Sequence, residues 1–229
     1  DIFITIDMQF QSVLIDALLR GLKKSGASSA NGVIVNPYNG EILAMASIPD
    51  FNPNNYEKYD VNTFNNRVIS DAYEPGSTFK AISLSAALEL EKTKLDDVYY
   101  CEMGQMKLKN NKLLRDHEEH GELSTLDIFA YSSNIGTSKI AEKLDNIELY
   151  KYCKNFGFGS KTCLPFNNES SGKIRSINNW SKTSKNYISI GQELSVTNIQ
   201  LALAYSAIAN GGYLLKPNII KEIKSNNKR

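Results

Sequence analysis

The chain has 229 residues, of which 41% are hydrophobic, so it is long enough to bury a sizeable core in one large domain or two small ones. Its 26 lysine and arginine residues nearly balance 25 aspartate and glutamate residues, so no net positive field draws it to nucleic acid and we expect no nucleic-acid partner. Its apolar runs fall short of the roughly 20 residues that a membrane span needs, so we expect no span within these residues.

Cysteine and histidine usage gives no metal site. The cysteines Cys101, Cys153 and Cys163 are odd in number and follow no metal-ligand spacing, so at most one disulfide forms and a buried thiol is the default interpretation of each. His117 and His120 lie close together in an acidic segment, but zinc needs a fixed ligand geometry and no further partner stands at a motif spacing. We interpret this segment as a solvated turn and expect no metal and no other cofactor.

The beginning of the chain predicts a strand, a helix and a hairpin. Residues 2–6 alternate like a short strand, and apolar residues over 10–18 recur at helical spacing. The runs 33–35 and 42–46 are almost continuously apolar, which is typical of strands covered on two faces by helices. The Asn-Gly pair between them can supply the positive φ angles of a tight turn. Residues 49–66, rich in Asn, Asp, Pro and Tyr, predict an ordered but irregular loop.

A serine and a lysine three residues apart, Ser77 and Lys80, stand where a loop gives way to a helix. Pro75 and Gly76 stop any earlier helix, and apolar residues then recur at three- and four-residue steps as far as Leu90. Side chains three apart on a helix lie about 5–6 Å apart at Cβ, so an unprotonated lysine amine can take the proton of the serine hydroxyl. The alternative interpretation of the four letters alone is a helix cap beside a solvated charge.

Context separates this pair from two others with the same spacing. Ser170/Lys173 and Ser225/Lys228 both lie among polar residues that predict loop, without the apolar periodicity of a buried helix face. Only the pair at Ser77 therefore predicts an activated nucleophile.

Two capping boxes mark later helices. Ser124 and Asp127 predict a helix that ends near Tyr131, and the Ser-Ser-Asn sequence at 132–134 then lies before a second helical pattern over 135–144. The other box begins at Thr197, with Gln200 three residues on, and predicts a helix that ends at the glycine pair 211–212.

The remaining segments carry weaker signals. Short alternating runs over 98–114 predict a small hairpin, and 149–156 predicts a short helix. Residues 163–185 predict a polar loop with Trp180 as its anchor. A strand is expected over 217–223, followed by a hydrophilic tail.

The sequence Glu-Pro-Gly-Ser-Thr-Phe-Lys at 74–80 resembles the first active-site motif of class B penicillin-binding proteins, the peptidoglycan transpeptidases. Further segments resemble this family in family order, and they are Asn66-Arg67, 32–47, Tyr-Ser-Ser-Asn-Ile-Gly at 131–136 and Gly-Gln-Glu-Leu-Ser-Val-Thr at 191–197. The resemblance runs from about residue 1 to residue 223. It implies an α/β fold in which an antiparallel sheet is flanked by helices, with one transpeptidase domain over 1–229 and a mostly helical subdomain over 77–145.

The resemblance also implies roles for four side chains. Ser77 is the expected nucleophile toward the D-Ala-D-Ala carbonyl of a peptidoglycan stem peptide, and Lys80 is the base for its acylation. Ser132 is expected to relay a proton to the leaving amine, while Asn134 holds the substrate amide and helps to orient Lys80. The Ser77 N–H is expected to give half of an oxyanion hole. β-Lactam antibiotics, which modify such a serine covalently, are the second class of ligand implied.

The third motif of the family, Lys-Thr-Gly, does not occur in these 229 residues. Lys161-Thr162 and Lys182-Thr183 approach it, but both lie in polar stretches before the helix that Thr197 opens. We therefore expect a domain that is incomplete at its C-terminal end and lacks its last strands. These residues on their own are expected to be inactive, because an oxyanion hole without one donor loses about 10²–10³ in rate.

Two other functions stay open. A serine β-lactamase or β-lactam sensor of the same fold would differ in how the acyl-enzyme is resolved, which turnover of a chromogenic β-lactam distinguishes. An inactive scaffold that binds cell-wall or divisome proteins is a different class, motivated by the absent third motif. Labelling with a fluorescent penicillin separates this class from the others.

Residues 116–136 are most similar to division-type members of the family, of the penicillin-binding protein 3 kind. This similarity implies a parent protein at the division septum, anchored in the bacterial inner membrane by an N-terminal segment absent here, with this domain on the periplasmic side. The partners it implies are divisome proteins, including a polytopic glycosyltransferase.

Overall fold

The computed structural model describes residues 1–109 and 111–224. The chain divides into two compact units. Unit 1 comprises residues 1–72, residues 160–172 and the described residues from 197 on. Unit 2 comprises residues 73–159 and 173–196.

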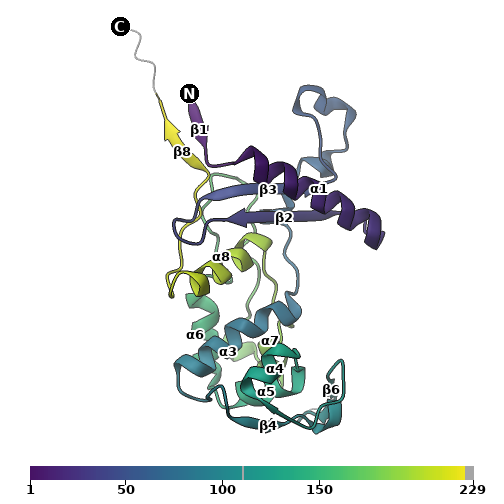
Figure 1. The fold of residues 1–229 in the computed structure, drawn as a ribbon, viewed down its shortest axis with the longest axis vertical. Helices are drawn as coiled ribbons and strands as arrows, with labels where there is room; N and C mark the ends of the chain where they lie inside the picture. The colour runs from purple at the N-terminus through teal and green to yellow at the C-terminus, as the bar shows by residue number, and fades with distance from the viewer. Residues whose placement is uncertain (110, 225–229) are drawn as a thin grey trace. The chain divides into compact units, whose positions relative to one another are not determined.

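Unit 1 is built on the predicted β-hairpin. Its helices and strands are β1 (Ile2–Ile4), α1 (Met8–Ser25), β2 (Ala30–Val35), β3 (Ile42–Ile48), α2 (Arg67–Ser70), α8 (Asn198–Ala209) and β8 (Ile220–Ile223). β2 and β3 pair antiparallel, with Val33 opposite Met45, and both α1 and α8 contact the hairpin (Figure 1). The prediction that helices cover these strands is confirmed, and the helices are α1 and α8.

The turn of the hairpin differs in detail from the prediction. Of the Asn39-Gly40 pair only Gly40 has a positive φ, at 75°. A Cβ at Gly40 would lie 2.5 Å from the Lys216 carbonyl oxygen, so close approach of another backbone adds to the requirement for glycine here. Asn39 instead accepts a hydrogen bond from the Glu41 N–H at 3.0 Å, the local bonding that makes asparagine favourable in turns.

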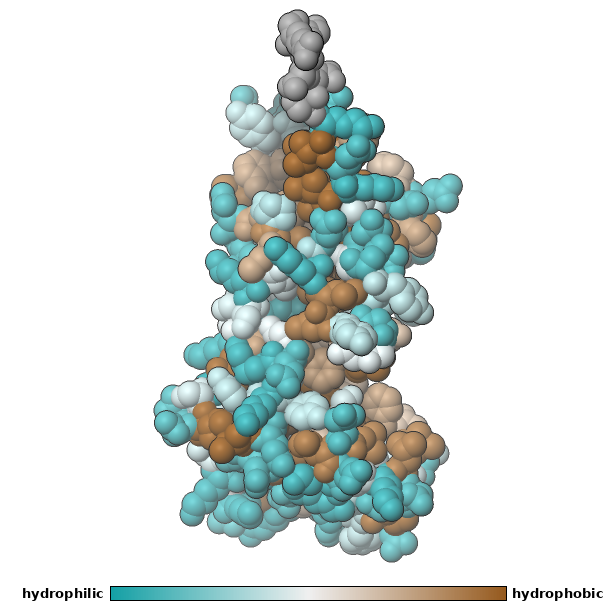
Figure 2. Space-filling view, turned by 90° about the vertical axis from the view of Figure 1, so that its left-hand side faces the viewer, coloured by the Kyte–Doolittle hydropathy of each residue, from teal (hydrophilic) through white to brown (hydrophobic). Residues whose placement is uncertain are grey.

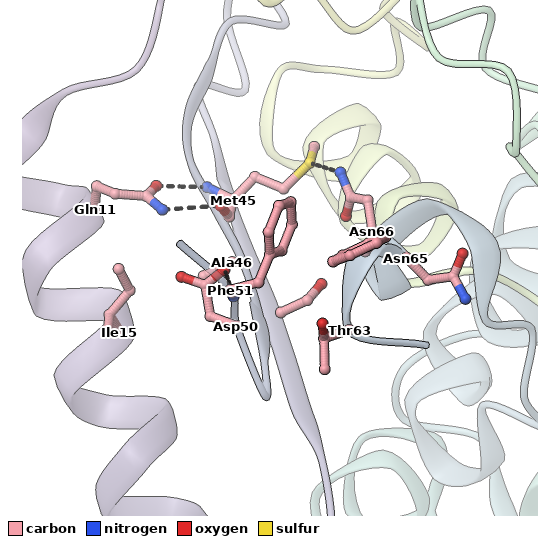
Figure 3. A pocket seen from close by; sticks show the side chains of 11 residues that line it. Gln11, Ile15, Met45, Ala46, Asp50, Phe51, Thr63, Asn65 and Asn66 are labelled. Atoms are coloured by element: carbon pink, nitrogen blue, oxygen red, sulfur yellow. Dashed lines mark hydrogen bonds between the residues drawn. The ribbon is translucent and has the colours of Figure 1, made fainter. Parts of the chain in front are cut away.

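α1 is capped and then joined to β3 by side chains of its first turns. The Asp7 carboxylate accepts a hydrogen bond from the Gln9 N–H at 2.8 Å, and the helix ends at Gly26, whose φ is 70°. The Gln11 amide donates to the Met45 carbonyl at 2.9 Å and accepts from the Met45 N–H at 2.9 Å (Figure 3). A side chain of α1 therefore satisfies both the N–H and the carbonyl of one residue of β3.

The segment over 49–66 is more regular than predicted. It contains two 3₁₀ helices, Pro53–Lys58 and Val61–Phe64, because Asn52 and Asp60 cap their first turns. The Phe51 and Phe64 rings pack with centroids 4.7 Å apart, which holds the segment as a small aromatic cluster. A cavity of about 210 Å³ opens beside the Gln11–Met45 hydrogen bonds (Figure 3). It is lined by Gln11, Ile15, Met45, Ala46, Ser47, Asp50, Phe51, Thr63, Phe64, Asn65 and Asn66.

The core of unit 1 lies between the hairpin, α2 and α8. Its buried members are Ile42, Val68, Ile69, Leu164, Ile199 and Leu203. The predicted capping box opens α8, with the Gln200 N–H donating to the Thr197 hydroxyl at 3.4 Å and the Thr197 N–H donating to the Gln200 side chain at 2.9 Å. The strand predicted over 217–223 is β8, which pairs antiparallel with β1. The predicted tail, with the Ser225/Lys228 pair, lies outside the described residues.

Unit 2 is mostly helical. Its described helices are the 3₁₀ helices η3 (Gly76–Phe79), η4 (Glu102–Gly104) and η5 (Ile177–Asn179), and the α-helices α3 (Lys80–Glu89), α4 (Thr125–Ala130), α5 (Asn134–Glu142), α6 (Asn146–Asn155) and α7 (Ser184–Ser189). Its strands are β4 (Val98–Tyr100), β5 (Gln105–Lys107), β6 (Leu113–Arg115) and β7 (Glu122–Ser124). α5 packs against α3, α4 and α7, and α6 packs against α3 and α7.

The small strands of unit 2 correct the prediction for 98–114. β5 and β6 form the expected hairpin, whose Asn110 lies outside the described residues, but β4 pairs with β7, with Val98 opposite Ser124. The capping box at Ser124 is half formed. Its hydroxyl accepts from the Asp127 N–H at 3.1 Å, but the Asp127 carboxylate accepts from that same hydroxyl at 2.6 Å instead of reaching back to the backbone.

The predicted polar loop over 163–185 ends in an unpredicted helix, α7. Trp180 joins this loop to α6, because its ring packs against the Tyr150 ring with centroids 6.4 Å apart, and its indole N–H donates within the loop to the Arg175 carbonyl at 3.0 Å. The buried residues of α7 are Ser184, Asn186, Ser189 and the apolar Ile188, and the Asn186 amide donates to the Ser138 hydroxyl at 2.7 Å and to the Glu142 carboxylate at 3.0 Å. Hydrogen bonds to α5, together with the burial of Ile188 rather than a full apolar stripe, therefore hold this helix in place.

The surface mixes polar and apolar residues. On the face that Figure 2 shows, hydrophobic side chains lie interspersed among hydrophilic ones, as is normal for a folded protein. Among the described residues, no helix combines the length and the apolar character needed to cross a membrane.

Candidate active site

The loop that carries Ser77 is held by a close approach of two glycines. The Gly76 N–H donates to the Gly191 carbonyl at 3.0 Å. A Cβ at Gly191 would lie 2.1 Å from the Gly76 oxygen, and Gly191 has φ of 78°, so only glycine fits here. Ser77 itself is exposed and lies in η3, one residue after the positive φ of Gly76. Its hydroxyl is therefore open to an incoming ligand.

Lys80 begins α3 and is the most deeply buried charged residue of the unit, with 1% of its surface exposed. Its Nζ donates to the Ser132 hydroxyl at 2.9 Å and also to the Ser132 carbonyl. Burial lowers the pKa of Lys80 to about 8, although the nearby Asp116 carboxylate acts in the opposite direction. An amine with this pKa is neutral often enough near neutral pH to accept a proton.

Ser132 lies between α4 and α5, as predicted. Its φ is 57°, a left-handed conformation that directs the chain out of α4 and into α5. Ser133 follows as the N-cap of α5, and its hydroxyl accepts from the Gly136 N–H at 2.9 Å. Tyr131 ends α4 by donating its N–H to the Asp127 carbonyl at 2.8 Å. The turn therefore directs the hydroxyl and the carbonyl of Ser132 toward the Lys80 amine.

Asn134 is held differently from the expectation. Its amide donates to the Arg115 carbonyl at 2.8 Å, and among the described residues it has no hydrogen bond to Lys80. Within the described residues, the Lys80 amine donates both of its hydrogen bonds to Ser132. The structure thus joins Lys80 to Ser132 directly, places Ser77 one turn before Lys80, and leaves Asn134 at the start of α5 beside them.

One residue of the site carries no signal in the local sequence. The Asp116 carboxylate accepts from the Ser133 hydroxyl at 2.6 Å and from the Ile135 N–H at 2.9 Å. Asp116 lies in the acidic segment that the sequence predicts to be a solvated turn, and its partners are 17 and 19 residues away. It directly follows β6, and the packing of β6 against α5 brings it to the site.

A cavity of about 270 Å³ lies beside the segment that precedes Ser77, lined by Glu74, Lys173, Arg175, Glu193, Leu194 and Ser195. The Glu193 N–H donates to the Glu74 carboxylate at 2.9 Å, and Arg175 forms an ion pair with Glu193. Lys173 lies in a β-bridge opposite Ser195 instead of on a helix, which agrees with its interpretation as a chance match to the motif.

The cysteines and histidines lie apart from any metal geometry. Among the described residues, no group of three or more His, Cys, Asp or Glu side chains could hold a metal ion. His120 stacks on the Tyr131 ring with centroids 5.2 Å apart. Cys101 and Cys153 are buried free thiols, and burial raises the pKa of Cys153 to about 12, but Cys163 is exposed, contrary to the expectation of a buried thiol. The residue that is buried at this point of the loop is its neighbour Leu164.

Comparison with known proteins identifies the family. Residues 31–229 match the model described as the penicillin binding protein transpeptidase domain. The chain belongs to this family. The family membership confirms the resemblance that the Ser77 and Ser132 motifs carried, and the α/β fold agrees with it.

Relatives and solved structures of this transpeptidase domain family agree. The chain is 36% identical to stage V sporulation protein D of Bacillus subtilis over 97% of its own length and 35% of that protein. It is 32% identical to the peptidoglycan D,D-transpeptidase FtsI homolog of Mesostigma viride over 95% of its length and 38% of that protein. The crystal structure of penicillin binding protein 3 from Mycobacterium tuberculosis, complexed with aztreonam, has a TM-score of 0.87 and 30% identity, covering 96% of this chain and 49% of that one. The chain thus spans little more than a third of these curated relatives.

Proposed function

We propose that the protein is a peptidoglycan D,D-transpeptidase that acts through a covalent acyl-enzyme on Ser77. The observation that carries the proposal is the buried Lys80 amine, one turn from an exposed serine and hydrogen bonded to Ser132. A lysine can act as a base only if its pKa is lowered, and burial supplies that change here. The names of the relatives support the reaction class.

The reaction begins with transfer of the Ser77 hydroxyl proton to the neutral Lys80 amine. The serine oxygen then forms a bond to the carbonyl carbon of the penultimate D-alanine of a stem peptide. Negative charge develops on the carbonyl oxygen, and the Ser77 N–H lies in a first helical turn, where backbone N–H groups lack intrahelical acceptors. This N–H is the donor we assign to the oxyanion from these residues.

Collapse of this intermediate breaks the C–N bond to the terminal D-alanine. The proton gained by Lys80 passes to the leaving amine through the Ser132 hydroxyl, which the Lys80 amine contacts at 2.9 Å. A neutral amine of a second stem peptide then attacks the ester carbonyl carbon, and its proton passes to the Lys80 amine through the Ser132 hydroxyl. The bond between the carbonyl carbon and the Ser77 oxygen breaks, Lys80 returns the proton to that oxygen, and the cross-link and the free serine are formed. Asn134 is assigned to the substrate amide, because it stands at the start of α5 next to this pair.

A penicillin is expected to acylate the same serine and to remain bound, because its leaving group stays tethered. One neighbour of known structure is a complex with aztreonam and another a complex with ampicillin, which makes β-lactams the second proposed ligand class. The cellular part of the proposal follows the sequence resemblance: a division-type enzyme of the inner membrane with this domain on the periplasmic side, working with divisome proteins that include a polytopic glycosyltransferase.

The test is covalent labelling of the natural full-length gene product with a fluorescent penicillin, followed by mass spectrometry of a tryptic digest. We expect one adduct, on Ser77, and no labelling of Ser77→Ala. Ser170→Ala is the matched control, because Ser170 has a lysine at the same spacing but belongs to unit 1. An adduct on another serine contradicts the assignment, and rapid turnover of a chromogenic β-lactam favours a β-lactamase instead.

A further inference from the structure

The Ser-Ser-Asn segment is held by the end of strand β6. The Arg115 carbonyl accepts from the Asn134 amide at 2.8 Å. The next residue, Asp116, accepts from the Ser133 hydroxyl at 2.6 Å through one carboxylate oxygen and from the Ile135 N–H at 2.9 Å through the other. Two adjacent residues of one strand end therefore hold the three consecutive residues that follow the proposed proton relay.

These contacts act on the conformation of Ser132 itself. A residue with φ of 57° is outside the favoured region for a side chain of this kind, so the conformation persists only where its neighbours fix it. Ser133 fixes it from the C-terminal side, because its hydroxyl caps α5 at Gly136 and donates to Asp116 at the same time. The carboxylate thus determines which way this hydroxyl points and where α5 begins.

The Asp116 carboxylate also interacts electrostatically with the Lys80 amine. Its negative charge favours the protonated amine and partly offsets burial, and no other charged group in the described part of the chain has a resolved effect on the pKa of Lys80. The charged or titratable side chains on the helices that pack against α3 are Lys139 and Glu142 on α5, Glu148, Tyr150, Lys151, Tyr152, Cys153 and Lys154 on α6, and Lys185 and Tyr187 on α7. Several of these pair elsewhere, such as Lys139 with Glu102.

We propose that Asp116 is a positioning residue for the Lys80–Ser132 pair, in which its carboxylate holds the Ser133–Ile135 turn that presents Ser132 to the lysine amine. The inference rests on the proposed function only in so far as this pair serves acylation of Ser77. Asp116 forms and breaks no bond in the reaction, and its effect is transmitted through the turn and through its charge.

Three variants of the full-length gene product separate these effects. Asp116→Asn keeps the shape of the side chain but removes its charge and its ability to accept from both donors. Ser133→Ala removes one of the hydrogen bonds and keeps the carboxylate. Glu118→Gln is the matched control, because it removes a charge from the same segment without contacting the motif. For each variant, the rate of acylation of Ser77 by a fluorescent penicillin is measured against pH, and the ¹³C shift of the Lys80 side chain is titrated by NMR.

We expect Asp116→Asn and Ser133→Ala to slow acylation about ten- to hundredfold, the scale of losing a charge-assisted hydrogen bond. Asp116→Asn also moves the Lys80 titration midpoint and the acid limb of the rate to lower pH, whereas Ser133→Ala leaves both in place. Glu118→Gln changes neither quantity. A merely structural role for Asp116 would slow the reaction without moving the midpoint, so an unmoved midpoint overturns the proposal.

The Lys80 titration and the hydrogen exchange of the Ile135 amide need no acylation. If the wild-type protein is not labelled but both readouts change in Asp116→Asn, the proposed function fails and this inference stands. If the wild type is labelled and Asp116→Asn matches it in rate and midpoint, the inference fails and the function stands. Should Asp116→Asn not fold by circular dichroism, Ser133→Ala decides, and a wild-type rate for that variant overturns the proposal.

Discussion

The dependence of acylation on pH follows from the burial of Lys80. With a pKa of about 8, the amine is neutral in about half of the molecules at pH 8, about one in ten at pH 7 and about one in a hundred at pH 6. At its ordinary value of 10.5, only about one in three thousand would be neutral at pH 7. The rate of acylation of Ser77 should therefore fall about tenfold for each pH unit below 7.

The assay is the second-order rate constant for labelling by a fluorescent penicillin, measured from pH 6 to pH 10 at constant ionic strength. Circular dichroism at each pH shows that the protein stays folded. Lys80→Ala provides the comparison, because it should lose about 10²-fold or more of the rate at pH 8, the scale of losing a general base, and should no longer show the acid limb.

Two results would refute this reasoning. A rate that is constant between pH 6 and pH 8 would mean that Lys80 is not the group whose neutral form is needed. A limb centred near pH 10 would mean that burial does not lower the pKa of Lys80 in solution, and the base would have to be sought elsewhere.

Three further predictions concern the scaffold. Lys80→Met should remove the cost of burying a charge. Between pH 8 and pH 10.5 only the unfolded wild-type chain holds the Lys80 proton, so the stability of the wild type relative to this variant should rise by up to about 3 kcal/mol over this range. Denaturant unfolding at both pH values measures the difference in stability, and a difference that stays constant would contradict the prediction. Gly191→Ala should displace the Gly76 loop, lower the free energy of unfolding by on the order of 3 kcal/mol and abolish most of the penicillin labelling. Gly211→Ala is the control, because Gly211 has a positive φ but open space around it; this variant should be destabilised only by the backbone strain of about 1–2 kcal/mol and keep its labelling. Thr197→Ala should cost about 1 kcal/mol in thermal unfolding and leave labelling unchanged, so a loss of labelling would show that this cap reaches the site.

The parts of the fold that were predicted are those that local rules determine. The hairpin over residues 33–46 follows from two apolar runs around Asn-Gly, and the start of α8 follows from the hydroxyl of Thr197 and an amide three residues later. Ser77 and Lys80 could be singled out as candidates because their spacing and the apolar period after them are local as well. In each of these elements the interacting residues are close in sequence, so the local pattern and the final structure agree.

The parts that were missed depend on distant partners. α7 has no apolar stripe, and Asn186 is buried only because α5 offers it a hydroxyl and a carboxylate. β4 pairs with β7 across more than twenty residues, and Asp116, at the end of β6, reaches the motif because the β5–β6 hairpin packs against α5. The resemblance led us to expect a role for Asn134 but did not predict its hydrogen bond to Arg115. None of these contacts has a signature in neighbouring residues.

The left-handed backbone of Ser132 limits how the motif can change over evolutionary time. Serine and threonine offer the same hydroxyl, but a β-branched residue is a genuine outlier at φ of 57°. The next residue, Ser133, has φ of −63° in an N-cap position, where threonine is an accepted substitute. A Ser-Thr-Asn motif is therefore compatible with this turn, whereas Thr-Ser-Asn is not, and a search pattern for related proteins should treat the two serines differently.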